Sequence, residues 1–210
     1  MELKLDIIQK EFIDLYNRLK TNELIIEPTL TESKKWSCGF MFELTPFFIE
    51  RSRGELKSYD ILDSKPNESY YKEASFVDNI ICNILNFNDQ KKTSFANFIH
   101  SNNKIKKIGI SLFHTGQSLN EIDYFHYKNE KIIKKESAFI SGASIEEYYY
   151  NDNNQLIKII INQRIDLIDE VIDTDNGMTN VPIHKIEYDL DYLDNKLISI
   201  LDSKGRNIMK

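Results

Sequence analysis

The chain carries four histidines, and their spacing decides whether they could bind a metal or act as acid–base groups. His100, His114, His126 and His184 stand apart from one another, and none belongs to an HExxH, HxH or Cys/His pattern. His114 and His126 could meet across a β-hairpin, which would suit a pair of metal ligands or hydrolytic residues. Two histidines on adjacent strands also arise easily by chance. We therefore expect no metal and no cofactor.

Three other kinds of pattern could indicate chemistry in this sequence. The stretch from Asp173 to Gly177 is similar to a calcium loop, but aligning Gly177 with the loop glycine places Ile172 and Ile183 where carboxylates are required. We expect a hairpin turn there. Glu146 and Glu147 are adjacent, so on a strand they face opposite sides and cannot work as a pair. No phosphate-binding loop and no GxSxG motif occurs, and the sequence predicts no catalytic residue and a protein that is not an enzyme.

Negative charge is concentrated in one segment. Nine acids lie between residues 166 and 194, namely Asp166, Asp169, Glu170, Asp173, Asp175, Glu187, Asp189, Asp191 and Asp194. Only Lys185 opposes them, so this segment carries a charge of about −8. The rest of the chain carries about +2, which gives the net charge of −6. The balance disfavours nucleic acid as a partner. A second set of charges is basic and is expected to form a solvated face beside nearby acids: Lys104, Lys106, Lys107, Lys131, Lys134 and Lys135.

Tyrosines are the other candidate contact residues. Tyr148, Tyr149 and Tyr150 are consecutive, so a strand must turn at least one ring away from the other two. A sheet with one covered face should therefore expose some of Tyr149, Tyr124 and Tyr192, although cross-strand aromatic pairs that only stabilise the sheet are an open alternative. Together with the acids, this predicts a partner-binding set: Asp169, Asp173, Glu187, Asp189, Asp191, Tyr149 and Tyr192.

A repeated unit positions these residues. A tyrosine-rich strand, an Asn/Asp turn and a returning apolar strand recur over residues 122–133, 148–159 and 186–200. Between 185 and 192 apolar and charged residues alternate, which predicts one packed face and one acidic, solvated face. From residue 105 onward we expect an antiparallel meander with strands at 105–113, 119–128, 131–140, 144–151, 155–172, 181–192 and 196–202.

The unit at 148–159 and 188–206 resembles the YD-type repeat of large bacterial shell proteins. The resemblance covers about a fifth of the chain, and Asn154 and Asn195 stand where that repeat has a turn glycine. It implies a β-hairpin and nothing about activity.

The first hundred residues predict a mixture of elements. Leu5, Ile8, Phe12, Leu15 and Leu19 recur at helical spacing, so a helix is expected over residues 3–20. The apolar residues of 76–85 and 95–99 predict two further helices, and 24–27, 39–44, 47–50 and 56–62 read as short strands. The expected fold is a single α+β domain, 1–210, in which an N-terminal helix and a mid-chain helical segment cover a large antiparallel β-meander.

Composition sets the broad class. A hydrophobic fraction of 41% excludes intrinsic disorder, and no apolar run reaches the roughly 20 residues that a bilayer requires. The first residues do not form a signal peptide, so a cytoplasmic location without membrane contact is expected. Cys38 and Cys82 lie in apolar surroundings and are expected to be buried free thiols.

These patterns favour a non-catalytic protein-binding module. The chain resembles, in general character only, the proteins that give bacteria immunity to their own toxins, and its acidic patch would suit a basic toxin. A hydrolase or small-ligand-binding protein with a pocket between sheet and helices, using His114 and His126, is the alternative. A surface β-protein would require a leader segment. The oligomeric state is left open.

Overall fold

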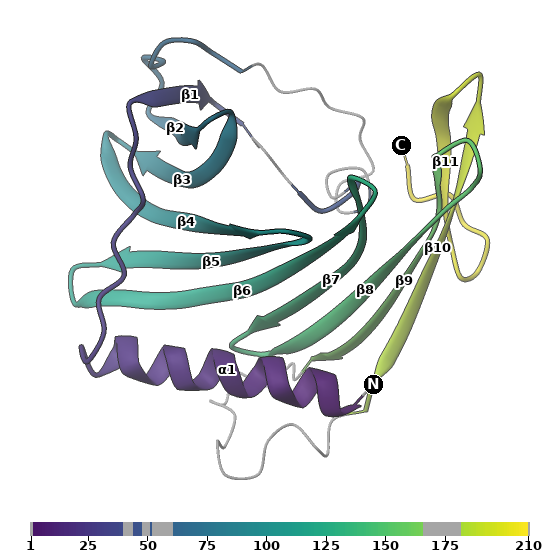
Figure 1. Ribbon diagram of the computed structural model, residues 1–210, viewed down its shortest axis with the longest axis horizontal. Coiled ribbons are helices and arrows are strands. Elements are labelled where there is room, and N and C mark those ends of the chain that lie inside the picture. Colours follow the sequence, from purple (N-terminus) through teal and green to yellow (C-terminus); the bar gives the residue numbers. More distant parts are fainter. Residues whose placement is uncertain (1, 40–43, 48–50, 52–60, 166–181, 210) are drawn as a thin grey trace.

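The computed structural model describes residues 2–39, 44–47, 51, 61–165 and 182–209. It contains one antiparallel sheet of eleven strands, in which every strand pairs with the next along the chain. Figure 1 shows this sheet curving from β1 to β11, with α1 lying across one rim. The elements are α1 (Glu2–Lys20), β1 (Ser33–Ser37), β2 (Tyr70–Val77), β3 (Ile80–Asn88), β4 (Lys91–Ser101), β5 (Lys104–Phe113), β6 (Gly116–Lys128), β7 (Lys131–Phe139), β8 (Gly142–Tyr150), β9 (Leu156–Ile165), β10 (His184–Leu193) and β11 (Lys196–Asp202).

The predicted meander is confirmed from β5 to β11, and one kind of turn recurs both within it and between the strands that precede it. Several hairpins close with two residues that both have positive φ, a geometry that matches the twist of antiparallel strands and favours Asn and Asp. These pairs are Asp78-Asn79, Asp89-Gln90, Asn129-Glu130 and Asp194-Asn195. Each is flanked by residues that pair across the hairpin.

The expected mid-chain helical segment is wrong, because residues 76–99 form the end of β2, then β3 and β4. The apolar spacing there is compatible with either structure. The turns at Asp78-Asn79 and Asp89-Gln90 interrupt the chain at intervals too short for a stable helix, and isoleucine-rich segments favour strands. The described residues thus form a mostly β fold with one helix.

Of the short strands expected before residue 62, only the one at 24–27 lies wholly among the described residues, and it does not form. Residues 24–27 are extended but unpaired with any strand, and side-chain amides hold them: Gln117 bonds the backbone of Ile26 in both directions, at 2.9 and 2.7 Å. The strands β1 and β2 were missed. Most of 39–44, 47–50 and 56–62 lies outside the described residues, as does the stretch 166–172 of the long strand expected over 155–172.

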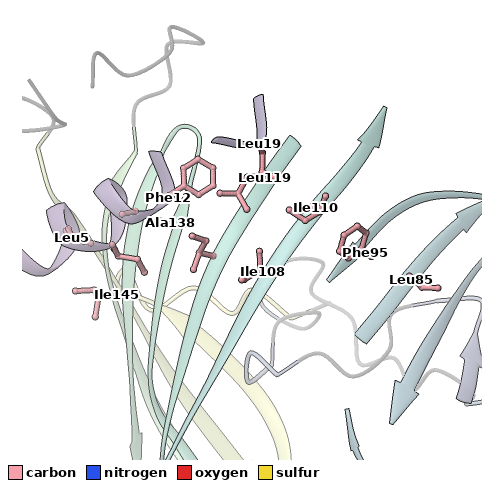
Figure 2. Packing of buried hydrophobic residues seen from close by; sticks show 13 residues of the cluster. Leu5, Phe12, Leu19, Leu85, Phe95, Ile108, Ile110, Leu119, Ala138 and Ile145 are labelled. Carbon is pink, nitrogen blue, oxygen red and sulfur yellow. The ribbon is translucent and has the colours of Figure 1, made fainter. Parts of the chain in front are cut away.

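The sheet has a helix face, on which α1 packs, and an opposite face. α1 packs over β6, β7 and β8, and its apolar stripe confirms the prediction. Figure 2 shows Leu5, Phe12 and Leu19 pointing toward sheet residues such as Leu119 and Ala138. Two helix positions depart from the amphipathic pattern. Gln9 is buried, with its Nε2 donating to the carbonyl of Phe139 at 3.3 Å, and Ile7 is 61% exposed.

The opposite face is also apolar and covered. Its larger cluster contains Phe125, Tyr148, Ile159, Leu190 and Ile200, and Leu44 and Phe47 pack against it from the segment after β1. A smaller cluster over β2, β3 and β4 also contacts Leu44. Covering of both faces bears directly on which side chains are available to a partner.

No helix among the described residues is long and apolar enough to cross a bilayer. Both cysteines are free thiols; Cys82 is buried as expected, whereas Cys38 is exposed because it follows the end of β1.

Candidate functional site

Strand β10 divides its side chains between the two faces as its alternation predicts. Leu190 is buried in the larger cluster of the opposite face, with Tyr188 packed beside it. Glu187, Asp189 and Asp191 point to the helix face, beyond β8, where the main packing of α1 ends. Asp189 and Asp191 are exposed. The structure therefore brings these three predicted acids together on a part of the sheet that α1, the one described helix, does not cover.

Lys158 of β9 lies among these acids. It is directly opposite Asp189, and its Nζ is 2.8 Å from Glu187 Oε2 and 3.8 Å from Asp189 Oδ1. Lys185 also forms an ion pair with Glu187. The hydrogen bonds from Lys158 and Lys185 lower the pKa of Glu187 to about 2, and the bond to Glu187 raises the pKa of Lys158. Like-charge crowding on β10 is thus smaller than the sequence indicates.

Tyr149 adjoins this group. It pairs directly with Lys158 across β8 and β9, lies on the same face and is 44% exposed. We call the set Tyr149, Lys158, Glu187, Asp189 and Asp191 the β10 surface. It combines an accessible aromatic ring with charges of both signs, which is a composition suited to protein contact.

Tyr192 does not belong to it. This side chain lies on the opposite face, partly buried, where its hydroxyl donates to the carbonyl of Leu156 at 3.0 Å. Tyr150 likewise donates to the carbonyl of Ile132 at 3.0 Å, and burial raises the pKa of both tyrosines. These rings stabilise the sheet. Asp169 and Asp173 lie outside the described residues, so the structure places four of the predicted site residues together and separates Tyr192 from them.

The histidine pair considered from the sequence does not form. His114 lies in the turn between β5 and β6. His126 lies at the other end of that hairpin, where it pairs with Lys104. His126 instead contacts Glu136, with Nε2 and Oε2 2.9 Å apart. Among the described residues no cluster of three or more His, Cys, Asp or Glu side chains could hold a metal.

Another polar cluster on the helix face ties α1 to the sheet. The hydroxyl of Tyr124 donates to both carboxylate oxygens of Glu11, at 2.6 and 2.8 Å, and Lys106 Nζ donates to the same group at 2.8 Å. Burial alone would raise the pKa of Glu11, but these bonds outweigh it and lower the pKa. Tyr124 is one of the three tyrosines of which some were expected to be exposed, and its hydroxyl is engaged by Glu11. Sequence reasoning missed this contact because Glu11 and Tyr124 are far apart along the chain.

Charged side chains are also buried on the opposite face. Asp123 is 1% exposed, and its carboxylate lies 3.4 Å from Lys107 Nζ and 3.7 Å from Lys135 Nζ. Arg51 pairs with Glu146 at 2.9 Å, and the Tyr148 hydroxyl donates to the same Glu146 oxygen at 3.0 Å. Most of the predicted basic set therefore does balance nearby acids, but partly inside the protein rather than on a solvated face.

A hollow of about 160 Å³ lies on the opposite face over β2–β6. Its lining includes Asn86, Ser94, Lys107 and Glu121, with Phe98 among the apolar residues, and no histidine. Gly109 belongs to the lining as well, and a Cβ there would approach the Glu121 side chain to 3.0 Å. The hollow is smaller than the several hundred Å³ usual for drug-sized ligands.

Comparison of the chain with protein-family models, with curated proteins and with solved structures gave no match.

Proposed function

We propose that this protein is a non-catalytic protein-binding module that contacts its partner through the β10 surface. The observation that supports this most is the location of that surface. Other strongly interacting charges, around Glu11, Asp123 and Glu146, are engaged in holding the fold together, whereas Tyr149, Asp189 and Asp191 extend from a part of the sheet that α1 does not cover.

The partner class that fits best is a basic protein, specifically a bacterial toxin that this chain neutralises. Four acids and two lysines are near one another on and beside the surface: Glu147, Glu187, Asp189, Asp191, Lys158 and Lys185. A net negative surface steers a basic partner and speeds its association. An immunity role requires rapid and tight capture of a toxin and no chemistry, which agrees with the lack of catalytic motifs in the sequence.

Binding of a small ligand is the second candidate, favoured by the hollow over β2–β6. The residues expected for hydrolysis do not support it, because His114 and His126 are at opposite ends of a hairpin and neither lines the hollow. The hollow could accept a compact polar molecule, but the acid and the base that line it, Glu121 and Lys107, already form an ion pair at 2.6 Å. Protein binding therefore remains the better account.

The test is neutralisation of a toxin encoded beside the gene, measured as rescue of growth on co-expression and as binding of the purified proteins. The variant Glu187→Lys/Asp189→Lys should slow association and flatten its dependence on salt. The control Glu23→Lys/Glu32→Lys changes the total charge equally at two exposed positions outside the surface. Absence of any neutralised or bound protein would contradict the function; equal behaviour of the two double variants would place the contact elsewhere.

A further inference from the structure

Lys158 is the central side chain of the β10 surface. Its ammonium group contacts Glu187 and Asp189 of β10, and the residue pairs across β8 and β9 with Tyr149, so the two carboxylates and the tyrosine lie on the same face on either side of Lys158. Its side chain is 35% exposed, lower than the 55% of Lys185, which reaches Glu187 from the same strand. A basic group from a partner that bound both carboxylates would have to displace Lys158, which contacts both of them.

We propose, building on the proposed function, that Lys158 occupies the position that an arginine of the partner takes in the complex. A guanidinium group at this position can donate hydrogen bonds to two carboxylates at once and stack on the ring of Tyr149. An ammonium group cannot make this combination of contacts. A lysine from the partner would only exchange one ammonium for another. An arginine gains the paired hydrogen bonds and the stacking, so Lys158 makes the surface selective for partners that present arginine.

Lys158 also lowers the affinity of the free surface for cations in general. Its ion pairs must be broken before a partner's side chain can enter, and exposed ion pairs of this kind are weak enough to be exchanged. Lys158 therefore acts as an internal competitor: it keeps Glu187 and Asp189 neutralised in the free protein and yields them to a group that binds better.

The inference can be tested without the natural partner. The probes are acetylated, amidated tetra-arginine and tetra-lysine peptides, titrated into the full-length protein and followed by NMR of Tyr149 and by calorimetry. The wild-type protein should bind tetra-arginine more tightly than tetra-lysine. Lys158→Met removes the internal competitor, so it should tighten tetra-arginine binding about fivefold. It should also reduce the ratio between the affinities for tetra-arginine and tetra-lysine.

Lys185→Met is the matched control, since it removes the same charge next to the same glutamate and should change affinity less than about twofold. Tyr149→Leu should reduce the preference for arginine, whereas Tyr149→Phe should keep it because the ring remains. Equal tightening in Lys158→Met and Lys185→Met would show a general charge effect and overturn the inference. Lack of peptide binding to Lys158→Met at millimolar concentration would overturn it as well.

These outcomes are separate from failure of the proposed function. Arginine-selective binding that depends on Lys158, with no protein neutralised, would retain the arginine site and reject the immunity role. A partner that binds through Glu187 and Asp189 with an affinity unchanged by Lys158→Met would support the proposed function and reject the arginine site.

Discussion

Two cross-strand pairs of lysine and aspartate occur in this sheet in the same register but in different surroundings. Lys107 lies directly opposite Asp123 on β5 and β6, and Lys158 lies directly opposite Asp189 on β9 and β10. Asp123 is 1% exposed, whereas the side chain of Asp189 is 59% exposed. The same local chemistry is thus placed once inside the protein and once on its surface.

The surroundings decide what each pair can do. In a region of low dielectric constant an ion pair that loses one member leaves a charge without compensation, so the pair is locked into the fold. In water the same pair contributes little to stability and can exchange its partner. The pairs at Asp123 are therefore expected to contribute to stability, whereas the pair at Asp189 is free to take part in the proposed recognition.

The largest expected effect follows from breaking the buried pair. Asp123→Ala removes the only carboxylate placed within 4 Å of both Lys107 and Lys135 among the described residues. We expect a loss of about 3 kcal/mol in the free energy of unfolding, measured by urea denaturation. Asp189→Ala, the matched change on the surface, should alter it by less than about 0.5 kcal/mol. Similar losses in the two variants would invalidate the comparison.

The buried pair should also make stability depend on acid. Burial alone would raise the pKa of Asp123, but Lys135 and Lys107 outweigh it and hold the pKa below its ordinary value. A carboxylate with a lowered folded pKa stabilises the protein fully above its unfolded pKa of about 3.9 and loses that contribution as the pH falls toward the folded value. The difference in unfolding free energy between the wild type and Asp123→Asn should therefore stay constant above about pH 5 and shrink below about pH 4. A difference that is independent of pH would contradict this.

Sequence reasoning recovered the elements whose signals are local. The helix of residues 3–20 has an uninterrupted stripe, and the strands after residue 105 are separated by Asn/Asp turns, so both were correct. The prediction of helices within residues 76–99 was wrong because the apolar residues there fit a helix and a strand equally well. There the turn residues Asp78-Asn79 distinguish the two structures, because both have positive φ and close a hairpin.

The candidate site was recovered only in part, for a different reason. The sequence predicted a sheet with one covered face. In the structure α1 packs on the helix face, and Leu44 and Phe47 pack on the opposite face. Once both faces are covered, alternation cannot tell which tyrosine is accessible, and Tyr192 was misassigned. Lys158 is 29 residues before Glu187 and enters the site through strand pairing, which no local pattern reveals.

A smaller effect distinguishes two neighbouring tyrosines. Tyr148 is 4% exposed on the opposite face and donates to Glu146, whereas Tyr149 is 44% exposed on the helix face. Tyr148→Phe removes one of the two donors to a buried oxygen of Glu146, leaving only Arg51, and should cost about 1 kcal/mol of unfolding free energy. Tyr149→Phe should cost less than about 0.5 kcal/mol. Calorimetric melting of both variants measures the contrast, and a reversed order would mean that the two faces are assigned incorrectly.

The smallest effect tests the exposed pair itself. The pKa of Glu187 is about 2 because Lys158 and then Lys185 donate hydrogen bonds to it, so this carboxylate should stay ionised in the folded protein to lower pH than an ordinary glutamate. In an NMR titration Lys158→Met should raise the pKa of Glu187 toward its ordinary value, and by more than Lys185→Met does, while the melting temperature changes little. High salt should reduce the shift in the wild type, because the pair is exposed to solvent.

A large drop in melting temperature in Lys158→Met would make Lys158 a structural residue like Lys107 and would remove the distinction between the two regions. An unchanged fold with a raised pKa would show that the interaction is strong enough to order the surface and weak enough to be given up to a partner.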